Sequence, residues 1–327
     1  MSHVIVIYKF NKSTDTLPTF NEGFLYSITD VDNEDNTITR TIESDELPNA
    51  ISFMSKKGLL EINEMNTDEV TDLYGAFYQC TNLTYVNLSK SNFSKVETIE
   101  GLFNSCSKLS KIDGLNSLDV SNVHNMGGVF SGCKALMELD ISNWNTSKVS
   151  NMGAMFRYCS KISSININDW NVDSVEIVTG MFQGCTNLQY LDLSNLKFNV
   201  DSISQMFYQC TNLKKIDMSN WSLPDTIGCN GLFSGCDNLK IVKVNNCSSG
   251  FINLIIDSLP IKSANSCNEL DICYIKDSVD NVNIDVAKSK YWNVCDIGMC
   301  NIKVVGMPKL KYRGMNITNI CTSKKRI

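Results

Sequence analysis

Cysteine is the residue type with the greatest chemical potential in this chain, which has 14 cysteines but only two histidines. Thiolates can bind zinc, attack a substrate or pair as disulfides. Four cysteines near the C-terminus are the candidates for a metal site: Cys267, Cys273, Cys295 and Cys300. Their spacings do not match the close pairs of common zinc sites, and no histidine lies near them. We therefore expect these four side chains to fill the core.

The other chemistry that the sequence could offer is weak. His3 and His124 lie far apart, and the chain has no Gly-x-Ser-x-Gly, paired metal-binding histidines or phosphate loop. The net charge is −6 with mixed signs, and the only dense basic run is Lys324 to Arg326. A nucleic-acid partner would need a basic stripe. We expect no enzyme activity, no cofactor, no metal and no nucleic-acid partner.

Seven cysteines belong to a repeated motif, Phe-x-x-Cys, at intervals of 25 to 27 residues. The pairs are Phe77/Cys80, Phe103/Cys106, Phe130/Cys133, Phe156/Cys159, Phe182/Cys185, Phe207/Cys210 and Phe233/Cys236. A fixed period of this length indicates stacked structural repeats. We expect the Phe and Cys columns to form the core, with the thiols reduced, because one repeat position next to Phe suits a small buried hydrophobe.

Two elements must position these residues in each repeat. Apolar residues six and eight positions after the cysteine predict a short strand, followed by a turn that contains Asn and often Trp. Val149, Met152, Met155 and Phe156 have helical spacing, which predicts a short helix in the rest of the repeat. The predicted fold class is an α/β solenoid, a leucine-rich repeat array with a parallel sheet on one face and short helices on the other.

The two ends do not follow the repeat. Residues 1–48 predict a small β unit, a cap or docking segment, with strands at 4–10, 24–28 and 37–42 and an acidic hairpin tip at 30–36 rather than a calcium loop. Residues 49–248 form the array, with Ile51 at the Phe position of an incomplete first repeat. Residues 249–327 predict a degenerate last repeat and a β-rich C-terminal cap, with a strand at 282–286 and a helix at 286–292.

The repeats resemble the BspA-like leucine-rich repeats. The stretches 139–152, with Leu-Asp-Ile-Ser-Asn-Trp-Asn, and 155–159, Met-Phe-Arg-Tyr-Cys, are close to that family's consensus, and the resemblance covers about residues 50–247. It implies a surface-exposed recognition or adhesion protein without catalytic activity. We find neither a leader nor an anchor, nor the ~20 apolar residues of a membrane span. Similar repeats occur in phage proteins, so a virion protein that binds a host receptor and an intracellular scaffold remain alternatives.

A recognition site on such an array would lie on the strand residues that face outward. Their rows predict contact with a protein or glycan, because tyrosine offers flat area and a hydroxyl. The candidates are Tyr85, Asp113, Glu138, Asp140, Tyr190, Asp192, Lys215 and Asp217. The Asp positions have an alternative, structural role toward neighbouring repeats. Trp144, Trp170 and Trp221 share one turn position, where we expect packing between repeats.

Overall fold

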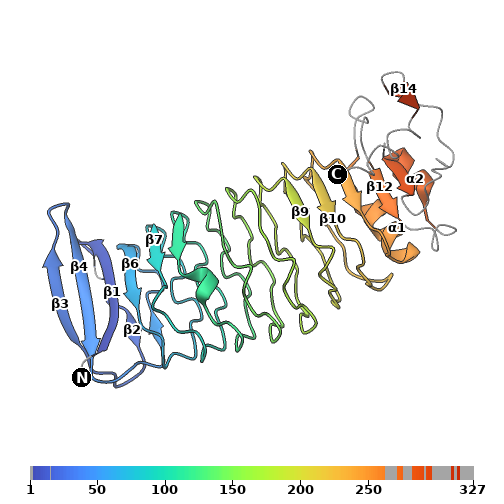
Figure 1. Ribbon diagram of the computed structural model, residues 1–327. Coiled ribbons are helices and arrows are strands. Elements are labelled where there is room, and N and C mark those ends of the chain that lie inside the picture. The colour runs from blue at the N-terminus through green and yellow to red at the C-terminus, as the bar shows by residue number, and fades with distance from the viewer. Residues whose placement is uncertain are drawn as a thin grey trace.

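The computed structural model describes residues 3–14, 16–261, 271–274, 282–290, 292–296, 311–312 and 315–316. The molecule is elongated, and successive repeats lie side by side along its length (Figure 1). Strands and turns dominate, and the described residues contain two α-helices, α1 (Ser249–Ser258) and α2 (Ile284–Ser289). The sheets are open, and none of those in the described part closes into a barrel.

Two sheets run along one side of the stack. The first has the order β3-β4-β1-β6-β7-β8, and the second has the order β13-β12-β11-β10-β9. Strand β1 is antiparallel to β4 and β6, whereas β6 to β8 and all strands of the second sheet are parallel. The first sheet comprises β1 (His3–Asn11), β3 (Ser27–Asp32), β4 (Thr37–Ser44), β6 (Leu59–Met65), β7 (Tyr85–Asn87) and β8 (Lys111–Asp113). The second comprises β9 (Tyr190–Asp192), β10 (Lys215–Asp217), β11 (Ile241–Lys243), β12 (Asp271–Tyr274) and β13 (Asn293–Asp296).

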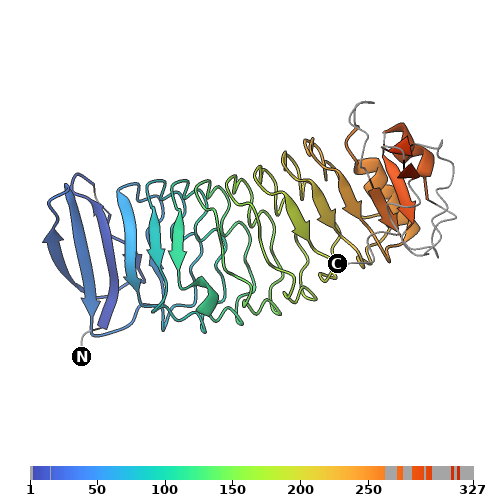
Figure 2. The same cartoon turned by 45° about the horizontal axis from the view of Figure 1, so that its top comes forward.

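Two small sheets complete the strand content. Strand β2 (Thr19–Phe20) pairs with β5 (Ile51–Ser52), and β14 (Lys311–Tyr312) pairs with β15 (Met315–Asn316). Between β8 and β9, two repeats have no strand at the corresponding positions, 138–140 and 164–166. The repeats continue through this interval, so the outer strand face is divided into two separate parts (Figure 2).

The predicted short helix in each repeat is wrong. In 99–106, the N–H groups of Gly101, Phe103 and Ser105 donate to carbonyl oxygens one repeat further on, at 2.7–2.9 Å. The residues between them bond the carbonyl three positions back, as Leu102 does to Ile99 at 3.0 Å. A helix needs all these N–H groups for its own turns. Bonding between repeats uses half of them, so the apolar spacing of three and four belongs to consecutive tight turns.

Glycine and a few other residues make these turns possible. Gly101 and Ser105 have positive φ, 63° and 65°, and the same two positions have positive φ in the other repeats of the Phe-x-x-Cys series. Only glycine adopts this left-handed conformation without steric cost. The sequence pattern therefore contains a turn signal that its apolar periodicity conceals.

The core is a continuous column of phenylalanine rings. Consecutive rings stack with centroids 5.4–5.9 Å apart, and all seven are fully buried. The column starts with Phe53, whose ring lies 5.7 Å from that of Phe77, and not with the predicted Ile51. Each ring therefore needs a neighbour on both sides to be covered, which makes the repeats mutually dependent.

Each of the seven repeated cysteines is a reduced thiol that bonds the repeat before it. All seven are buried: Cys80, Cys106, Cys133, Cys159, Cys185, Cys210 and Cys236. The Sγ donates to the carbonyl oxygen of the preceding phenylalanine at 2.9–3.1 Å, for example Cys159 to Phe130. The same carbonyl oxygen also accepts the backbone N–H of the residue three positions later in its own repeat, and a carbonyl oxygen can accept two bonds. Cysteine is thus both a small apolar filler and a second donor to this carbonyl, from the next repeat.

Cys236, the last cysteine of the series, shows what the core prediction left out. We predicted it as a core residue, and the structure agrees and adds a hydrogen bond. The side chain is buried as expected, but its Sγ also donates to the Phe207 carbonyl oxygen at 3.0 Å. The repeat after Cys236 changes character as well, since α1 begins at Ser249 where the earlier repeats have strand-leaving turns and then tight turns. Cys236 therefore marks the end of the regular array and bonds back to the repeat before it.

Burial should make these thiols unreactive in the folded protein. It raises the pKa of Cys80 and of Cys159 to about 12, so about one thiol in 10⁴ is ionised at pH 8. We expect iodoacetamide at pH 8 to modify the partly exposed Cys229 at least tenfold faster than either buried thiol. Peptide mapping by mass spectrometry measures this, with urea-unfolded protein as the control. Equal rates in the folded protein would contradict the buried column.

The tryptophans pack between repeats, as predicted. All three are buried, and Trp144 and Trp170 stack with centroids 6.2 Å apart. Their indole N–H groups donate to carbonyl oxygens of Leu115, Ile141 and Leu193 at 2.8–3.0 Å. The interval from Cys106 to Cys133 is 27 residues, one more than in most repeats. A 3-10 turn, η1 (Leu115–Ser117), follows Gly114 in this interval, and the parallel register of β7 with β8 is regular.

The ends agree with the sequence in part. The predicted strands at 4–10 and 37–42 lie within β1 and β4, while β3 begins later than expected. The acidic run carries cross-strand ion pairs, Arg40–Asp30, Lys12–Asp32 and Lys9–Asp35. Helix α1, which begins at the Ser248 cap, is an element that the sequence reasoning missed. The predicted strand at 282–286 is wrong because α2 begins at Ile284.

Several predictions fall outside the described residues. They concern the side chains of Cys267, Cys273, Cys295 and Cys300 and the end of the predicted helix at Tyr291. The greater part of the predicted C-terminal cap after Asp296 also lies outside the described residues. Only the backbone of Cys273 and Cys295 is described, and these two residues are paired between β12 and β13.

Candidate functional site

On the first sheet, three predicted outward-facing side chains form one cluster. Tyr85 lies opposite Lys111 in the register of β7 and β8. The Tyr85 hydroxyl and the Lys111 Nζ both donate to the same carboxylate oxygen of Asp113, each at 2.8 Å. The Lys111 Nζ also lies 5.3 Å from the centroid of the Tyr85 ring, within the range of a cation–π contact.

The charges of this cluster are mutually satisfied. The bonds from Lys111 and then Tyr85 hold the pKa of the exposed Asp113 carboxyl below its usual value. Burial, followed by the bond to Asp113, raises the pKa of the Tyr85 hydroxyl. Tyr85 is therefore a neutral donor already engaged within the protein.

The second sheet offers a more open arrangement. Tyr190 lies opposite Lys215, which lies opposite Ile241, so these three side chains form one row across β9, β10 and β11. Tyr190 is 58% exposed. Strand spacing places its ring about 5 Å from the neighbouring lysine position. A flat apolar ring beside a cation suits a sugar ring or a protein ridge.

The row of aspartates beside it has a structural role. Asp192 accepts bonds from the Ser194 backbone N–H at 3.0 Å and from its hydroxyl at 2.7 Å. Asp217 makes the same pair of bonds with Ser219, and its other oxygen lies 3.1 Å from the Lys243 Nζ. These bonds close the turn that leaves each strand. The carboxylates are thus largely engaged in shaping the repeat.

Glu138 and Asp140 lie in the interval between the two sheets. Both are exposed, and the Asp140 carboxylate accepts a bond from the Ser142 hydroxyl at 3.1 Å. Their repeat has no strand at this position, so they do not continue either row. The eight candidate residues therefore separate into two groups, Tyr85 with Asp113 and Tyr190 with Asp192, Lys215 and Asp217, with Glu138 and Asp140 between them.

The predicted core residues lie apart from this surface. The pairs from Phe77/Cys80 to Phe233/Cys236 are all buried inside the stack, so neither the rings nor the thiols reach the outward row. They can support a binding surface only by fixing the spacing of the repeats.

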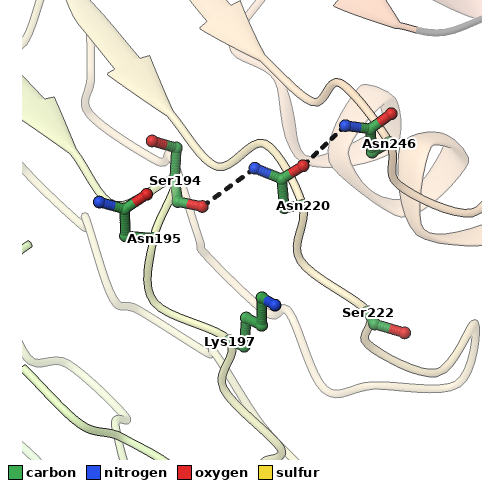
Figure 3. Close-up of a pocket in the computed structure, with 6 residues that line it drawn as sticks. All are labelled: Ser194, Asn195, Lys197, Asn220, Ser222 and Asn246. Carbon is green, nitrogen blue, oxygen red and sulfur yellow. Dashed lines mark hydrogen bonds between the residues drawn. The ribbon is translucent and has the colours of Figure 1, made fainter.

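A polar depression next to the second group was missed by the sequence reasoning. Figure 3 shows its lining residues: Ser194, Asn195, Lys197, Asn220, Ser222 and Asn246. The Asn246 side chain donates to the Asn220 side-chain oxygen at 2.7 Å, and Asn220 donates to the Ser194 carbonyl oxygen at 3.2 Å. The signal was the recurring Asn after each strand, which we had interpreted only as a turn residue.

A family model described as "Mycoplasma protein of unknown function, DUF285" matches residues 48–164 and, in a second overlapping match, residues 130–246. Together these matches cover more than half of the chain. The chain belongs to the DUF285 family. This membership fits a BspA-like surface repeat protein. No curated protein matches the chain.

The DUF285 region can be compared repeat by repeat within this one chain. The core Phe and Cys are identical in all seven copies, whereas the outward row changes type from copy to copy: Tyr85, Lys111, Glu138, Ser164, Tyr190, Lys215 and Ile241. The Phe and Cys of the core are therefore constant from repeat to repeat, and the outer row is not.

Other kinds of site have less support in this DUF285 protein. Among the described residues, no three His, Cys, Asp or Glu side chains are grouped closely enough to hold a metal ion. The same residues include no helix that is long and apolar enough to cross a membrane.

Proposed function

We propose that this protein is a non-enzymatic recognition protein of a cell surface, in which a leucine-rich-repeat solenoid of the BspA-like kind binds a protein or glycan. The observation that carries the proposal is the outer row of the strands. It varies between repeats, whereas the Phe and Cys positions of the core are invariant and buried. An exposed row whose side chains differ from repeat to repeat, held on a constant core, can present a specific pattern of contacts to a partner.

The second sheet is the better contact surface. Tyr85 is held by Asp113 and Lys111, so binding through it would first break bonds within the protein. Tyr190 is exposed and lies opposite Lys215, and the asparagine-lined depression borders the same repeats. Aromatic side chains supply contact area at low entropic cost, and amides can bond hydroxyl or peptide groups. We place the contact on Tyr190, Lys215 and Asn220.

The expected result is binding of the purified chain to at least one glycan in a panel, to wall polysaccharide, or to intact cells. A Tyr190→Ala/Lys215→Ala variant should lose at least tenfold in affinity for that target, since central aromatic contacts dominate binding energy. Surface plasmon resonance or flow cytometry measures this loss.

Tyr74→Ala is the matched control, because Tyr74 is 57% exposed and lies in the consecutive turns of its repeat, outside the strand rows. It should bind as the unmodified chain does. An equal loss in both variants would overturn the placement on the second sheet. Absence of binding to every cell and polymer, or turnover of a glycan or peptide substrate, would overturn the recognition proposal itself.

A further inference from the structure

Strand β3 is the outermost strand of the first sheet, and among the described residues it has a neighbour on one side only (Figures 1 and 2). The Asn33 N–H donates to the Thr37 carbonyl oxygen at 3.0 Å, and the antiparallel register continues without a shift to Ser27 opposite Glu43. Antiparallel pairs exchange hydrogen bonds at every second residue. The backbone N–H and C=O groups of Ile28, Asp30 and Asp32 therefore point away from β4, toward the free edge.

This edge lacks most of the features that usually prevent an added strand. Edge strands are commonly short, covered, charged, or interrupted by proline or a bulge. Of these features β3 has only the charges of Asp30 and Asp32, which oppose an acidic partner and not a basic one. All six residues of β3 are exposed, with no proline and no register shift against β4. Apolar side chains are exposed on it and just before it, including Leu25 at 83% and Val31 at 58%. Beside them, the rings of Phe20, Phe24 and Tyr26 lie with centroids 4.8–6.1 Å apart.

The N-terminal unit that carries this edge is strongly acidic. Residues 1–48 contain nine Asp and Glu against three Lys and Arg, a net charge of −6. All three bases, Lys9, Lys12 and Arg40, are engaged in ion pairs with the β3 hairpin. Five of the acids form no ion pair within the part of the chain that the structure describes: Glu22, Glu34, Glu43, Asp45 and Glu46. A ligand for this edge should be an extended, basic polypeptide.

The chain itself contains such a segment. Residues 297–327 contain seven Lys and Arg and no Asp or Glu. In the sequence they follow β13, the terminal strand of the second sheet, and that sheet lies at the other end of the molecule from β3 (Figure 1). Reaching β3 of the same copy would require crossing about 60 Å of stacked strands, which would use more than half of the segment at ~3.4 Å per residue. A second copy placed end to end has no such distance to cross.

We propose that the free edge of β3 binds the basic C-terminal section, residues 297–327, of a second copy, and that the part of this section after β15, residues 317–327, forms the added strand. The added strand receives backbone bonds from the outward groups of Ile28, Asp30 and Asp32. Its Lys and Arg side chains lie among the unpaired acids, and its apolar side chains cover Leu25 and Val31. The contact joins unlike surfaces, so it propagates head to tail rather than closing as a symmetric dimer.

The test measures the association state of the full chain. Sedimentation velocity is recorded at protein concentrations from 1 to 100 μM, at low and at high salt. Ile28→Pro removes an outward N–H without removing a β3–β4 bond, and Ile28→Ala is the matched control that keeps the donor. The Lys324→Glu/Lys325→Glu/Arg326→Glu variant alters the tail alone. We expect concentration-dependent oligomers at low salt, dispersed by high salt, and at least tenfold weaker association in the Pro and tail variants, with a smaller change for Ile28→Ala. Circular dichroism checks that each variant is folded.

Mixing the two blocked variants gives the decisive result. The Ile28→Pro copy still has the unmodified basic C-terminal section, and the Lys324→Glu/Lys325→Glu/Arg326→Glu copy still has the unmodified β3 edge. The mixture should therefore form a one-to-one dimer and nothing longer. A monomeric chain at 100 μM in low salt would overturn the proposal. So would equal association of all variants, or a mixture that remains monomeric, the result expected if the tail binds within its own copy or the edge serves a different protein.

Discussion

Replacing Phe156 by alanine should lower the free energy of unfolding by about 3–5 kcal/mol, the range measured for large aromatic side chains removed from cores. The Phe156 ring is fully buried and stacks between Phe130 and Phe182, with centroids 5.9 and 5.5 Å away. Removing it takes apolar area from the core and leaves two neighbouring rings facing a cavity. A chemical denaturation curve followed by circular dichroism measures the loss.

Tyr190→Ala is the control for this variant, because it removes an aromatic ring that is 58% exposed. It should change the free energy of unfolding by about 0.5 kcal/mol or less, as surface substitutions do. A Phe156→Ala effect below about 1 kcal/mol, or similar effects of the two substitutions, would mean that the phenylalanine column is not the core.

Gly114→Ala should destabilise the protein by about 2–4 kcal/mol, although it adds only a methyl group. Gly114 has φ of 87°, a conformation that costs an L-residue roughly 1–2 kcal/mol. A Cβ there would also lie 2.5 Å from the Ser89 backbone nitrogen and 2.7 Å from the Leu88 carbonyl carbon. Backbone of the preceding repeat cannot yield as a flexible side chain can, so overpacking adds to the conformational cost.

Gly23→Ala separates the conformational cost of a positive φ from the steric cost of an added Cβ. Gly23 has a similar φ of 78°, but an added Cβ there meets no atom within 4 Å. It should therefore show the conformational cost alone, about 1–2 kcal/mol. Thermal or urea unfolding of both variants gives the comparison, and equal losses would show that contact between the repeats at Gly114 is unimportant.

The helical prediction shows where sequence reasoning was limited. Val149, Met152, Met155 and Phe156 have the spacing of an apolar helix face, and all four are buried. The same spacing also suits consecutive turns of three residues. The choice between them depends on whether N–H groups bond within the repeat or across to the next, and the Phe156 N–H donates to the Met181 carbonyl oxygen at 2.9 Å. That partner is 25 residues away and cannot be inferred from a local window.

The sequence predicted the burial of the cysteine column but not its hydrogen bonds. The repeat position of Cys236 and its six counterparts correctly indicates burial beside phenylalanine. The thiol's second role, as donor to the carbonyl of the preceding repeat, depends on a side-chain direction that spacing does not give. A small apolar residue at the same position would fill the space and leave that carbonyl with its backbone N–H donor alone.

The candidate site was likewise predicted only in part. Alternation along the strands correctly identifies the residues that share a row, since Tyr190 lies opposite Lys215 and Asp192 opposite Asp217. Alternation does not tell which of these side chains form hydrogen bonds or ion pairs within the protein. Asp113 holds Tyr85, and Asp217 holds Ser219 and Lys243, because of side-chain rotamers and turn geometry. The interruption of the strands between β8 and β9, which separates two groups of candidates, also has no sequence signal that we could identify.

By itself, the sequence determined the repeat, its period and its interior, because a buried Phe and Cys at each turn of the chain must be the same size to stack on their copies. It also determined the acidic N-terminal unit and the basic C-terminal section. Only the tertiary structure decided how the backbone is satisfied, which strand edge remains open and which polar side chains are engaged, because each of these depends on partners about 26 residues away or at the far end of a sheet.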